Sequence, residues 1–188
     1  MEAATKKIAV VAAFPLHALK SFGPSFYPKE HFATWLPTTL YRRDRRCMGE
    51  ILANIKPDLV HAWGTEDVCG LAGVLSPAPC ILSMQGILSH LVRYGWHHPR
   101  VYFQVMLEVF CLRRAACVTV ESDWGRQKIR PFRGKRPVEV IEYGVHPDFF
   151  KARWQPDIHK PRFLFLGTIC AQKGIQDCVA AFRDARMS

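Results

Sequence analysis

The sequence KPDLVHAWGTED occupies residues 56–67 and gives the clearest indication of the fold. Its proline disfavours a helical conformation in the residue before it, so we expect the preceding helix, residues 44–55, to end there. The apolar residues 59–62 predict a short buried strand, and Gly64 provides the turn that follows it. A helix, a buried strand and a glycine turn in this order are typical of an α/β unit with a parallel sheet.

The same alternation continues in both directions along the chain. Short apolar runs predict further strands, and amphipathic or proline-initiated stretches predict helices between them. The expected strands are residues 7–13, 79–83, 117–120, 138–141 and 162–166, and the expected helices are residues 99–114, 122–129 and 174–186, with residues 31–40 leaning towards helix. The sequence therefore predicts a Rossmann-like α/β fold, in which helices flank a parallel sheet.

A polar segment with two prolines, residues 151–161, interrupts this alternation and is typical of an interdomain linker. We therefore predict a first Rossmann-like domain over residues 1–150. Residues 162–188 then supply the first strand and helix of a second such domain. One strand and one helix cannot bury a core by themselves, so we expect this second domain to be truncated.

The composition is that of a protein with a hydrophobic core, since 49% of the 188 residues are hydrophobic. The apolar run at residues 8–16 is much shorter than the roughly 20 residues of a membrane span, and no cleavage site follows it. A buried strand is therefore favoured over a signal peptide. The seven cysteines include no CxxC pair, and their odd number argues against a disulfide framework, which favours a reducing, cytoplasmic compartment.

The formal net charge of +10 predicts a surface that attracts anions. Basic clusters occur at residues 42–46, 113–114 and 126–136, and an ordinary solvated surface explains each of them equally well. A noncatalytic basic module that binds nucleic acid or an anionic membrane is the alternative function that this charge leaves open. No nucleic-acid motif accompanies the charge, so we expect no nucleic-acid partner. The first cluster suggests peripheral contact with the inner face of an anionic membrane.

Five sequence motifs follow one another in the order of a known family. They are KPDLVHAWGTED (56–67), PCILSMQGIL (79–88), AACVTVESDWGRQK (115–128), VIEYGVHPDFF (140–150) and FLFLGTICAQKGIQDCVAAF (163–182). Together they resemble the strand-end motifs of glycosyltransferase family 4, which has the two-domain GT-B fold. The resemblance implies that a sugar passes from a nucleotide-diphosphate sugar to a glycan or lipid-linked acceptor, with the acceptor on the first domain and the donor on the second.

The fifth motif predicts where the donor phosphates bind. By the resemblance, the candidate residues are Lys173 and Gly174 at a helix start and Gly167 and Thr168 at a strand end. Backbone N–H groups and the helix dipole favour an anion at such a place, and Lys173 adds a full charge. The family usually has an arginine where this chain has Thr168, which predicts a weaker phosphate clamp. A solvated lysine at the start of a helix is the alternative interpretation of Lys173.

The first, second and fourth motifs predict the sugar and acceptor site. The candidates are Trp63, Gly64, Glu66, Gln85, Gly86 and Gly144, and His61 is a candidate catalytic residue or, equally, a structural histidine. A tryptophan offers an apolar face to a sugar ring, and the glycines allow a ligand to approach the backbone. Two departures from the family pattern are Gln85, where a histidine is usual, and Tyr143, where an asparagine is usual.

The resemblance implies no cofactor and no metal, because helix dipoles and basic side chains hold the diphosphate in such enzymes. His90, His97 and His98 have no carboxylate at ligand spacing, which argues against a metal site. The glutamates that contact the donor in the family lie later in the second domain. We therefore expect these 188 residues to be an incomplete enzyme that does not catalyse transfer alone, with the first domain abbreviated because few residues separate its first strand from His61.

Overall fold

The computed structural model describes residues 6–12, 42–65, 68–94, 99–151, 153, 155, 159, 162–169 and 173–187. The chain divides into two compact units, Met1–Gly144 and Val145–Ser188. The sheet and the hydrophobic core belong to the first unit. A short 3-10 helix and the last α-helix belong to the second.

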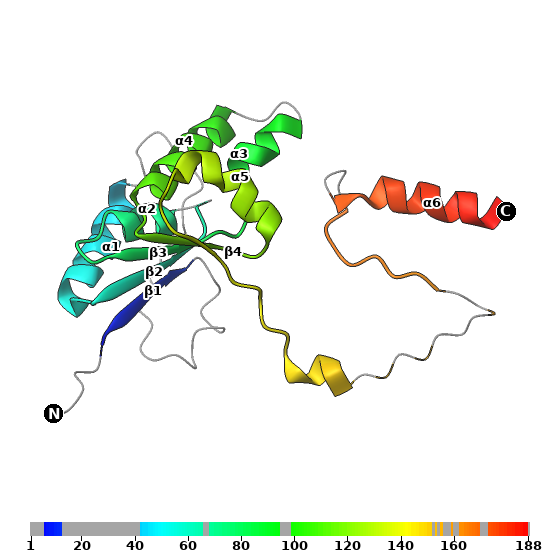
Figure 1. Cartoon of the computed structure of the whole chain (residues 1–188), viewed down its shortest axis with the longest axis horizontal. Helices are drawn as coiled ribbons and strands as arrows, with labels where there is room; N and C mark the ends of the chain where they lie inside the picture. Colours follow the sequence, from blue (N-terminus) through cyan, green and yellow to red (C-terminus); the bar gives the residue numbers. More distant parts are fainter. Residues whose placement is uncertain are drawn as a thin grey trace. The chain divides into compact units, whose positions relative to one another are not determined.

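The first unit is built on a parallel sheet of five strands (Figure 1). The strands are β1 (Ile8–Ala12), β2 (Leu59–Trp63), β3 (Cys80–Ser83), β4 (Cys117–Val120) and β5 (Val138–Val140). They lie in the order β1-β2-β3-β4-β5, and each pairs in parallel with the next. The prediction of a Rossmann-like parallel sheet is confirmed, and the ends of these five strands differ from the predicted ones by no more than one residue.

Helices connect the strands of the first unit. They are α1 (Arg42–Ile55), α2 (Val68–Val74), α3 (Leu88–Leu91), the 3-10 helix η2 (Val92–Tyr94), α4 (Pro99–Arg114) and α5 (Asp123–Arg133). The predicted helices over residues 44–55, 99–114 and 122–129 are confirmed, although α5 runs one turn further than expected. The Ser122 hydroxyl begins α5 by accepting a hydrogen bond from the Gly125 amide at 3.2 Å. The helix expected at residues 31–40 lies outside the described residues.

Helix α2 was not expected from the sequence. All seven of its residues are buried, so its sequence VCGLAGV shows no polar face and no helical period. A β-carbon added at Gly73 would lie 2.6 Å from the β-carbon of Ala62 on β2 and 3.0 Å from the sulfur of Cys80 on β3. Glycine is therefore needed at this position because it lets the helix lie directly against the sheet.

The two faces of the sheet differ in burial. Val60, Leu82 and Val118 are 0% exposed and belong to the face that the helices cover. Because parallel strands are joined by right-handed crossovers, a strand order without reversal places successive helices on one side, and Figure 1 shows α2, α4 and α5 there. On the other face Ile8 and Val10 are 61% and 56% exposed, and Val10 pairs in register with His61.

A buried arginine fixes the edge of the sheet where the strands begin. Arg133 on α5 is 3% exposed and donates to the carbonyl oxygens of Leu112, Ala115 and Pro137. The carbonyls at the end of α4 lack partners within their own helix, and the guanidinium supplies them. Arg133 thereby joins the last turn of α4 to the residue before β5.

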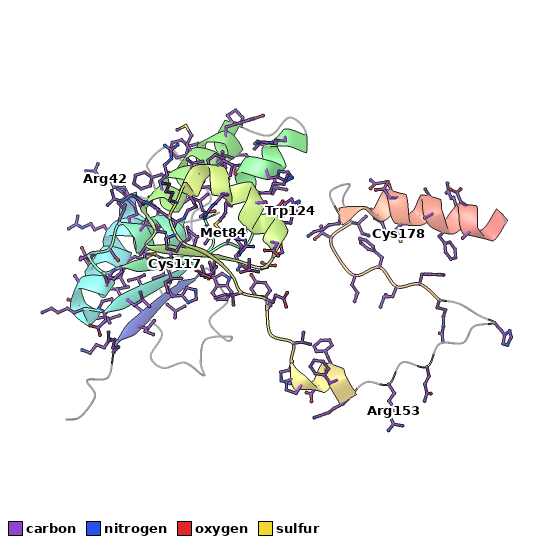
Figure 2. All side chains as sticks on the ribbon, in the orientation of Figure 1. Arg42, Met84, Cys117, Trp124, Arg153 and Cys178 are labelled. Carbon is purple, nitrogen blue, oxygen red and sulfur yellow. The ribbon has the colours of Figure 1, made fainter. Side chains whose placement is uncertain are left out.

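The second unit has the 3-10 helix η3 (Pro147–Lys151) and the helix α6 (Ile175–Met187), on which Cys178 is labelled in Figure 2. The predicted helix over residues 174–186 is confirmed. The strand expected at residues 162–166 is not present, because these residues have no ladder with any described strand. Phe163 and Leu164 are 75% and 81% exposed, and the Phe163 ring lies 5.3 Å from the Phe182 ring of α6. An apolar run becomes a strand only when another strand pairs with it.

Candidate functional site

The candidate site lies at the carboxyl ends of the strands. All five strands are parallel, so the segments that follow β2, β3, β4 and β5 leave the sheet at the same edge. In open α/β sheets ligands bind at this edge, usually at a point where the strand order reverses. The described strands contain no reversal. Because the strand order does not mark a binding point, we locate the candidate site from the side chains at the strand ends.

A chain of hydrogen bonds crosses three strands at this edge. The His61 Nε2 atom on β2 lies 2.7 Å from the Ser83 hydroxyl oxygen on β3, which lies 2.6 Å from the Thr119 hydroxyl oxygen on β4. The strand register explains this alignment, because Ser83 pairs with both Trp63 and Thr119, and His61 shares the face of Trp63. Each of the three residues thus lies on the sheet face opposite the helices.

The environment of His61 favours a neutral imidazole. Its side chain is half-buried, and this burial lowers the pKa of His61 below its ordinary value of 6.5. Ser83 occupies the Nε2 side of the ring, which leaves Nδ1 for any other partner. When Nε2–H donates to Ser83 and Ser83 donates to Thr119, Nδ1 carries the lone pair and is able to accept a proton.

Aromatic rings lie beside this hydrogen-bonded chain. The Trp63 ring is 5.4 Å from the His61 ring and 6.2 Å from the Tyr143 ring, and the planes of Trp63 and Tyr143 differ by only 16°. Gln85, after β3, donates from Nε2 to the Tyr143 hydroxyl at 2.7 Å. The predicted residues His61, Trp63 and Gln85 are therefore brought together, with Tyr143 as the fourth member.

The predicted glycines differ in conformation. Gly64 has a φ of 82° and donates its amide to the Ser83 carbonyl at 2.8 Å, so the turn after β2 requires glycine. Gly86 and Gly144 are not among the residues with positive φ. Around Gly144 no atom lies within 4 Å of an added β-carbon, which leaves the backbone open to a ligand. Glu66 lies outside the described residues.

A buried carboxylate organises the loops at this edge. Glu108 on α4 is 0% exposed and accepts hydrogen bonds from the Leu88 and Ser89 amides at 2.8 and 2.9 Å. It also accepts a hydrogen bond from the Thr65 hydroxyl at 3.3 Å. The loops after β2 and β3 are thus tied to one side chain, which satisfies two amides at the start of α3.

A hollow lies between α1 and the end of α2. Its volume is about 410 Å³, and the basic residues Arg42, Arg45 and Arg46 line it together with Leu52 and Leu75. Because α2 ends just before β3 begins, the Leu75 side of this hollow faces the amino ends of the strands. The basic cluster predicted at residues 42–46 is therefore separate from the strand-end cluster.

The predicted donor residues belong to the second unit. Lys173 is exposed and directly precedes Gly174, whose φ is 73° and whose carbonyl accepts the first helical hydrogen bond of α6 from Cys178 at 3.0 Å. Gly167 and Thr168 are exposed. Lys173 therefore lies at the start of a helix, as the fifth motif predicted.

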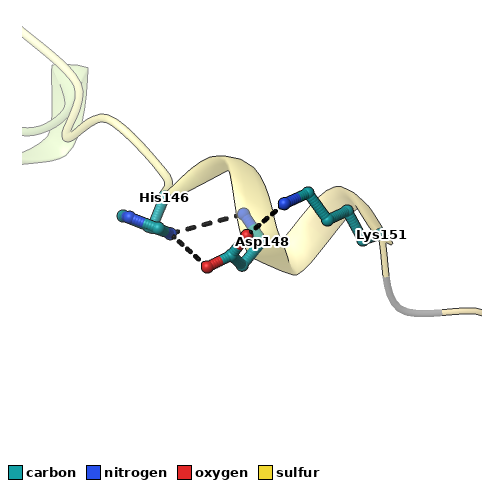
Figure 3. Close-up of polar contacts among 3 residues, drawn as sticks. All are labelled: His146, Asp148 and Lys151. Carbon is teal, nitrogen blue, oxygen red and sulfur yellow. Dashed lines mark hydrogen bonds and ion pairs between the residues drawn. The ribbon is translucent and has the colours of Figure 1, made fainter.

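Three ionisable side chains lie on and beside η3 in the second unit. Asp148 accepts a hydrogen bond from the Lys151 ammonium at 2.6 Å and lies 3.3 Å from His146 Nδ1 (Figure 3). These side chains are 65% to 76% exposed, so the ion pairs contribute little to stability. These contacts are local to η3, so this part of the fourth motif forms an exposed turn and not a buried site.

Three further observations concern the described residues as a set. Among them, no three His, Cys, Asp or Glu side chains gather in a way that could hold a metal ion. None of the helices that the structure describes is both long enough and apolar enough to cross a bilayer. None of the described cysteines forms a disulfide, and burial raises the pKa of Cys80 to about 11 and that of Cys111 to about 12.

Comparison with known proteins agrees with this arrangement. The profile of Glycosyltransferase Family 4 matches residues 7–149, which is more than half of the chain. The chain belongs to glycosyltransferase family 4. The resemblance that the strand-end motifs indicated is thereby confirmed for the first four motifs, which lie within the matched residues except for Phe150. The family 4 match ends before the fifth motif, and no curated protein matched the chain.

Some residues at the carboxyl ends of the strands were not expected to belong to the candidate site from the sequence. Ser83 and Thr119 each lie in a predicted strand, at positions that alternate with buried apolar residues, and this alternation is the signal that places them on the face opposite the helices. Tyr143 was noted only as a departure from the family pattern. Glu108 is an acid within an apolar helix, which is a signal of a buried and partnered carboxylate.

Proposed function

We propose that this chain is part of a glycosyltransferase that moves a sugar from a nucleotide-diphosphate sugar to a glycan or lipid-linked acceptor, and that the first unit binds the acceptor. The main support is the cluster of His61, Trp63, Gln85 and Tyr143 at the carboxyl ends of parallel strands in a family 4 domain. Polar and aromatic groups that converge in this way suit a ligand with both hydroxyl groups and apolar faces.

Each member of the cluster has a part in the proposal. Trp63 and Tyr143 present rings to the apolar face of a sugar, and Gln85 fixes the orientation of Tyr143 by its hydrogen bond. His61 is the candidate for accepting the proton of the acceptor hydroxyl through Nδ1, since Ser83 and Thr119 hold its other nitrogen. Glu66, Gly64, Gly86 and Gly144 complete the proposed acceptor contacts.

As part of this proposal, we assign the binding of the sugar donor to the second unit. Lys173 and Gly174, at the start of α6, and Gly167 and Thr168 would hold the donor diphosphate, because amide groups and the positive end of a helix attract anions. Unit Val145–Ser188 has no described strand to cover the exposed Leu164, Leu166 and Val179. We therefore propose that transfer needs more donor-binding structure than residues 162–188 provide, and that these 188 residues alone are inactive.

The proposed setting is a cytoplasmic protein that contacts the inner face of an anionic membrane peripherally. The net charge of +10 and the three arginines of α1 that line the hollow between α1 and α2 support this setting. It would bring the enzyme to a lipid-linked acceptor.

Acceptor binding can be tested on the 188-residue chain without sugar transfer. A panel of short glycans and prenyl-diphosphate sugars is titrated while tryptophan fluorescence is followed. Tyr143→Ala should weaken the binding of the recognised acceptor by roughly fivefold to tenfold, the usual value of an aromatic contact. Phe149→Ala, which removes another exposed ring, is the control and should change nothing. If no panel member binds, or if Tyr143→Ala binds as tightly as the original chain, the assignment of the acceptor to this cluster fails.

A further inference from the structure

The outward face of α4 is apolar, contrary to the usual pattern of a surface helix. The exposed residues of α4 are Pro99, Tyr102, Met106, Phe110, Arg113 and Arg114. An ordinary surface helix exposes charged and polar residues and buries the apolar ones. Here Tyr102, Met106 and Phe110 are 43%, 63% and 39% exposed, while Glu108, the acid of this helix, is 0% exposed.

These side chains form one row along the helix. Tyr102, Met106 and Phe110 follow at intervals of four residues, so they lie one above another on a single face. The row ends at two arginines, and the Arg114 guanidinium lies 5.6 Å from the centre of the Phe110 ring. The exposed face of α4 therefore combines an apolar row with positive charge and contains no negative charge.

We propose that this α4 row, Tyr102, Met106 and Phe110 with Arg113 and Arg114, inserts into the interface of an anionic lipid bilayer. Aromatic and long apolar side chains next to arginines are typical of helices that lie in the plane of a membrane surface. The arginines complement the negative charge of the lipid headgroups. Three partly exposed side chains offer far less area than the roughly 800 Å² that each partner of a stable protein complex contributes, so a lipid surface fits this row better than a protein does.

The α4 row also bears on the proposed acceptor site. Helix α4 follows β3 and leads to β4, so it begins on the side of the sheet where the strands end and where His61, Trp63 and Tyr143 gather. A bilayer against the whole length of α4 would meet that edge at Tyr102 and the opposite edge at Arg113 and Arg114. The link between this lipid contact and the acceptor site rests on the proposed function. The lipid contact itself is tested separately, because lipid binding is measured without any sugar donor or acceptor.

The test is cosedimentation of the full 188-residue chain with vesicles of phosphatidylcholine alone and of phosphatidylcholine with phosphatidylglycerol. We expect binding to the anionic vesicles that falls about fivefold for each of Arg113→Gln and Arg114→Gln. The triple variant Tyr102→Ser, Met106→Gln, Phe110→Ser should bind at least about tenfold more weakly. The double variant Phe149→Ser, Phe150→Ser removes exposed rings of the second unit and is the matched control, which should bind as the original chain does.

Circular dichroism and thermal unfolding of each variant establish that the fold is retained. Should a multiple variant fail to fold, Met106→Gln alone replaces it, since Met106 is the most exposed of the three. Equal binding to neutral and anionic vesicles would overturn the proposal, and so would unchanged binding of the folded triple variant. Sedimentation velocity tests whether a second copy of the chain binds to this face instead. If the chain does not bind vesicles but self-associates, and the triple variant does not self-associate, the proposal is overturned in favour of a dimer.

Discussion

The carboxylate of Glu108, in the middle of α4, accepts a hydrogen bond from the backbone amide of Leu88 at 2.8 Å. Leu88 begins α3 in the loop region that follows β3, so a residue of a later helix holds the backbone next to the candidate site. Thr65, after β2, donates to the same carboxylate. The loop that follows Trp63 and the loop that contains Gln85 are therefore fixed relative to each other through one side chain.

Replacing Glu108 should destabilise the fold strongly. Glu108→Ala creates a cavity where the buried carboxylate was and leaves the part-buried Leu88 and Ser89 amides without their acceptor, which should cost about 2–4 kcal/mol of unfolding free energy. Glu108→Gln keeps one acceptor oxygen and should cost less. Urea unfolding measures both, with the exposed Glu139→Ala as the control, expected to change stability by no more than about 0.5 kcal/mol. Similar losses for Glu139→Ala and Glu108→Ala would contradict the role given to the buried carboxylate.

Acidification should destabilise the protein in part through His61. Burial holds the pKa of His61 below 6.5 in the folded protein, so below that pH the unfolded chain binds the proton first. The stability present above pH 6.5 is therefore lost as the pH falls towards the folded pKa. His61→Gln, which can still donate to Ser83, should lose less stability between pH 7.5 and 5.5. Urea unfolding at these pH values is the measurement, and a pH dependence in His61→Gln equal to that of the original chain would contradict this role of His61.

Replacing Gly73 or Gly49 by alanine should change stability in opposite directions, because only Gly73 packs closely against the sheet. Gly73→Ala places a β-carbon 2.6 Å from that of Ala62, and the sheet cannot yield, so we expect a loss of about 1–3 kcal/mol. Gly49→Ala on α1 meets no atom within 4 Å and should stabilise the protein by about 0.5–1 kcal/mol through helix propensity. Thermal unfolding of both variants decides the matter, and equal effects would mean that α2 does not lie against β2 as described.

The sequence predicted the elements that carry a period or a boundary signal. Strands β2 and β4 are alternately buried and half-buried, and α1 ends just before Pro57, so both classes were located to within a few residues. Helix α2 escaped prediction because burial on every side leaves no hydrophobic period to detect. Residues 162–166 were expected as a strand because they are apolar, but pairing depends on a neighbour that the composition of the segment does not reveal.

The sequence predicted several residues of the candidate site, but only part of their arrangement in space. His61, Trp63 and Gln85 were chosen because they stand at strand ends, and the parallel sheet does bring them to one edge. The bonds of His61 to Ser83 and of Ser83 to Thr119 depend on strand register, which is a relation between distant segments. The roles of the predicted residues in binding stay predictions, and the donor residues most of all.

The donor prediction concerns Lys173, which is exposed and directly precedes Gly174 and α6. An ammonium group beside the positive end of a helix would make a charge-assisted contact with a phosphate, so Lys173→Ala should weaken the binding of nucleoside diphosphates by about 1.5–3 kcal/mol, or roughly tenfold to hundredfold. Calorimetry measures this in a polypeptide that carries these 188 residues followed by a complete donor-binding domain. Lys151→Ala is the matched control, because Lys151 is an exposed lysine of the same unit that already pairs with Asp148. An unchanged affinity in Lys173→Ala, or an equal loss in both variants, would mean that general charge attraction and not a contact at the helix start binds the diphosphate.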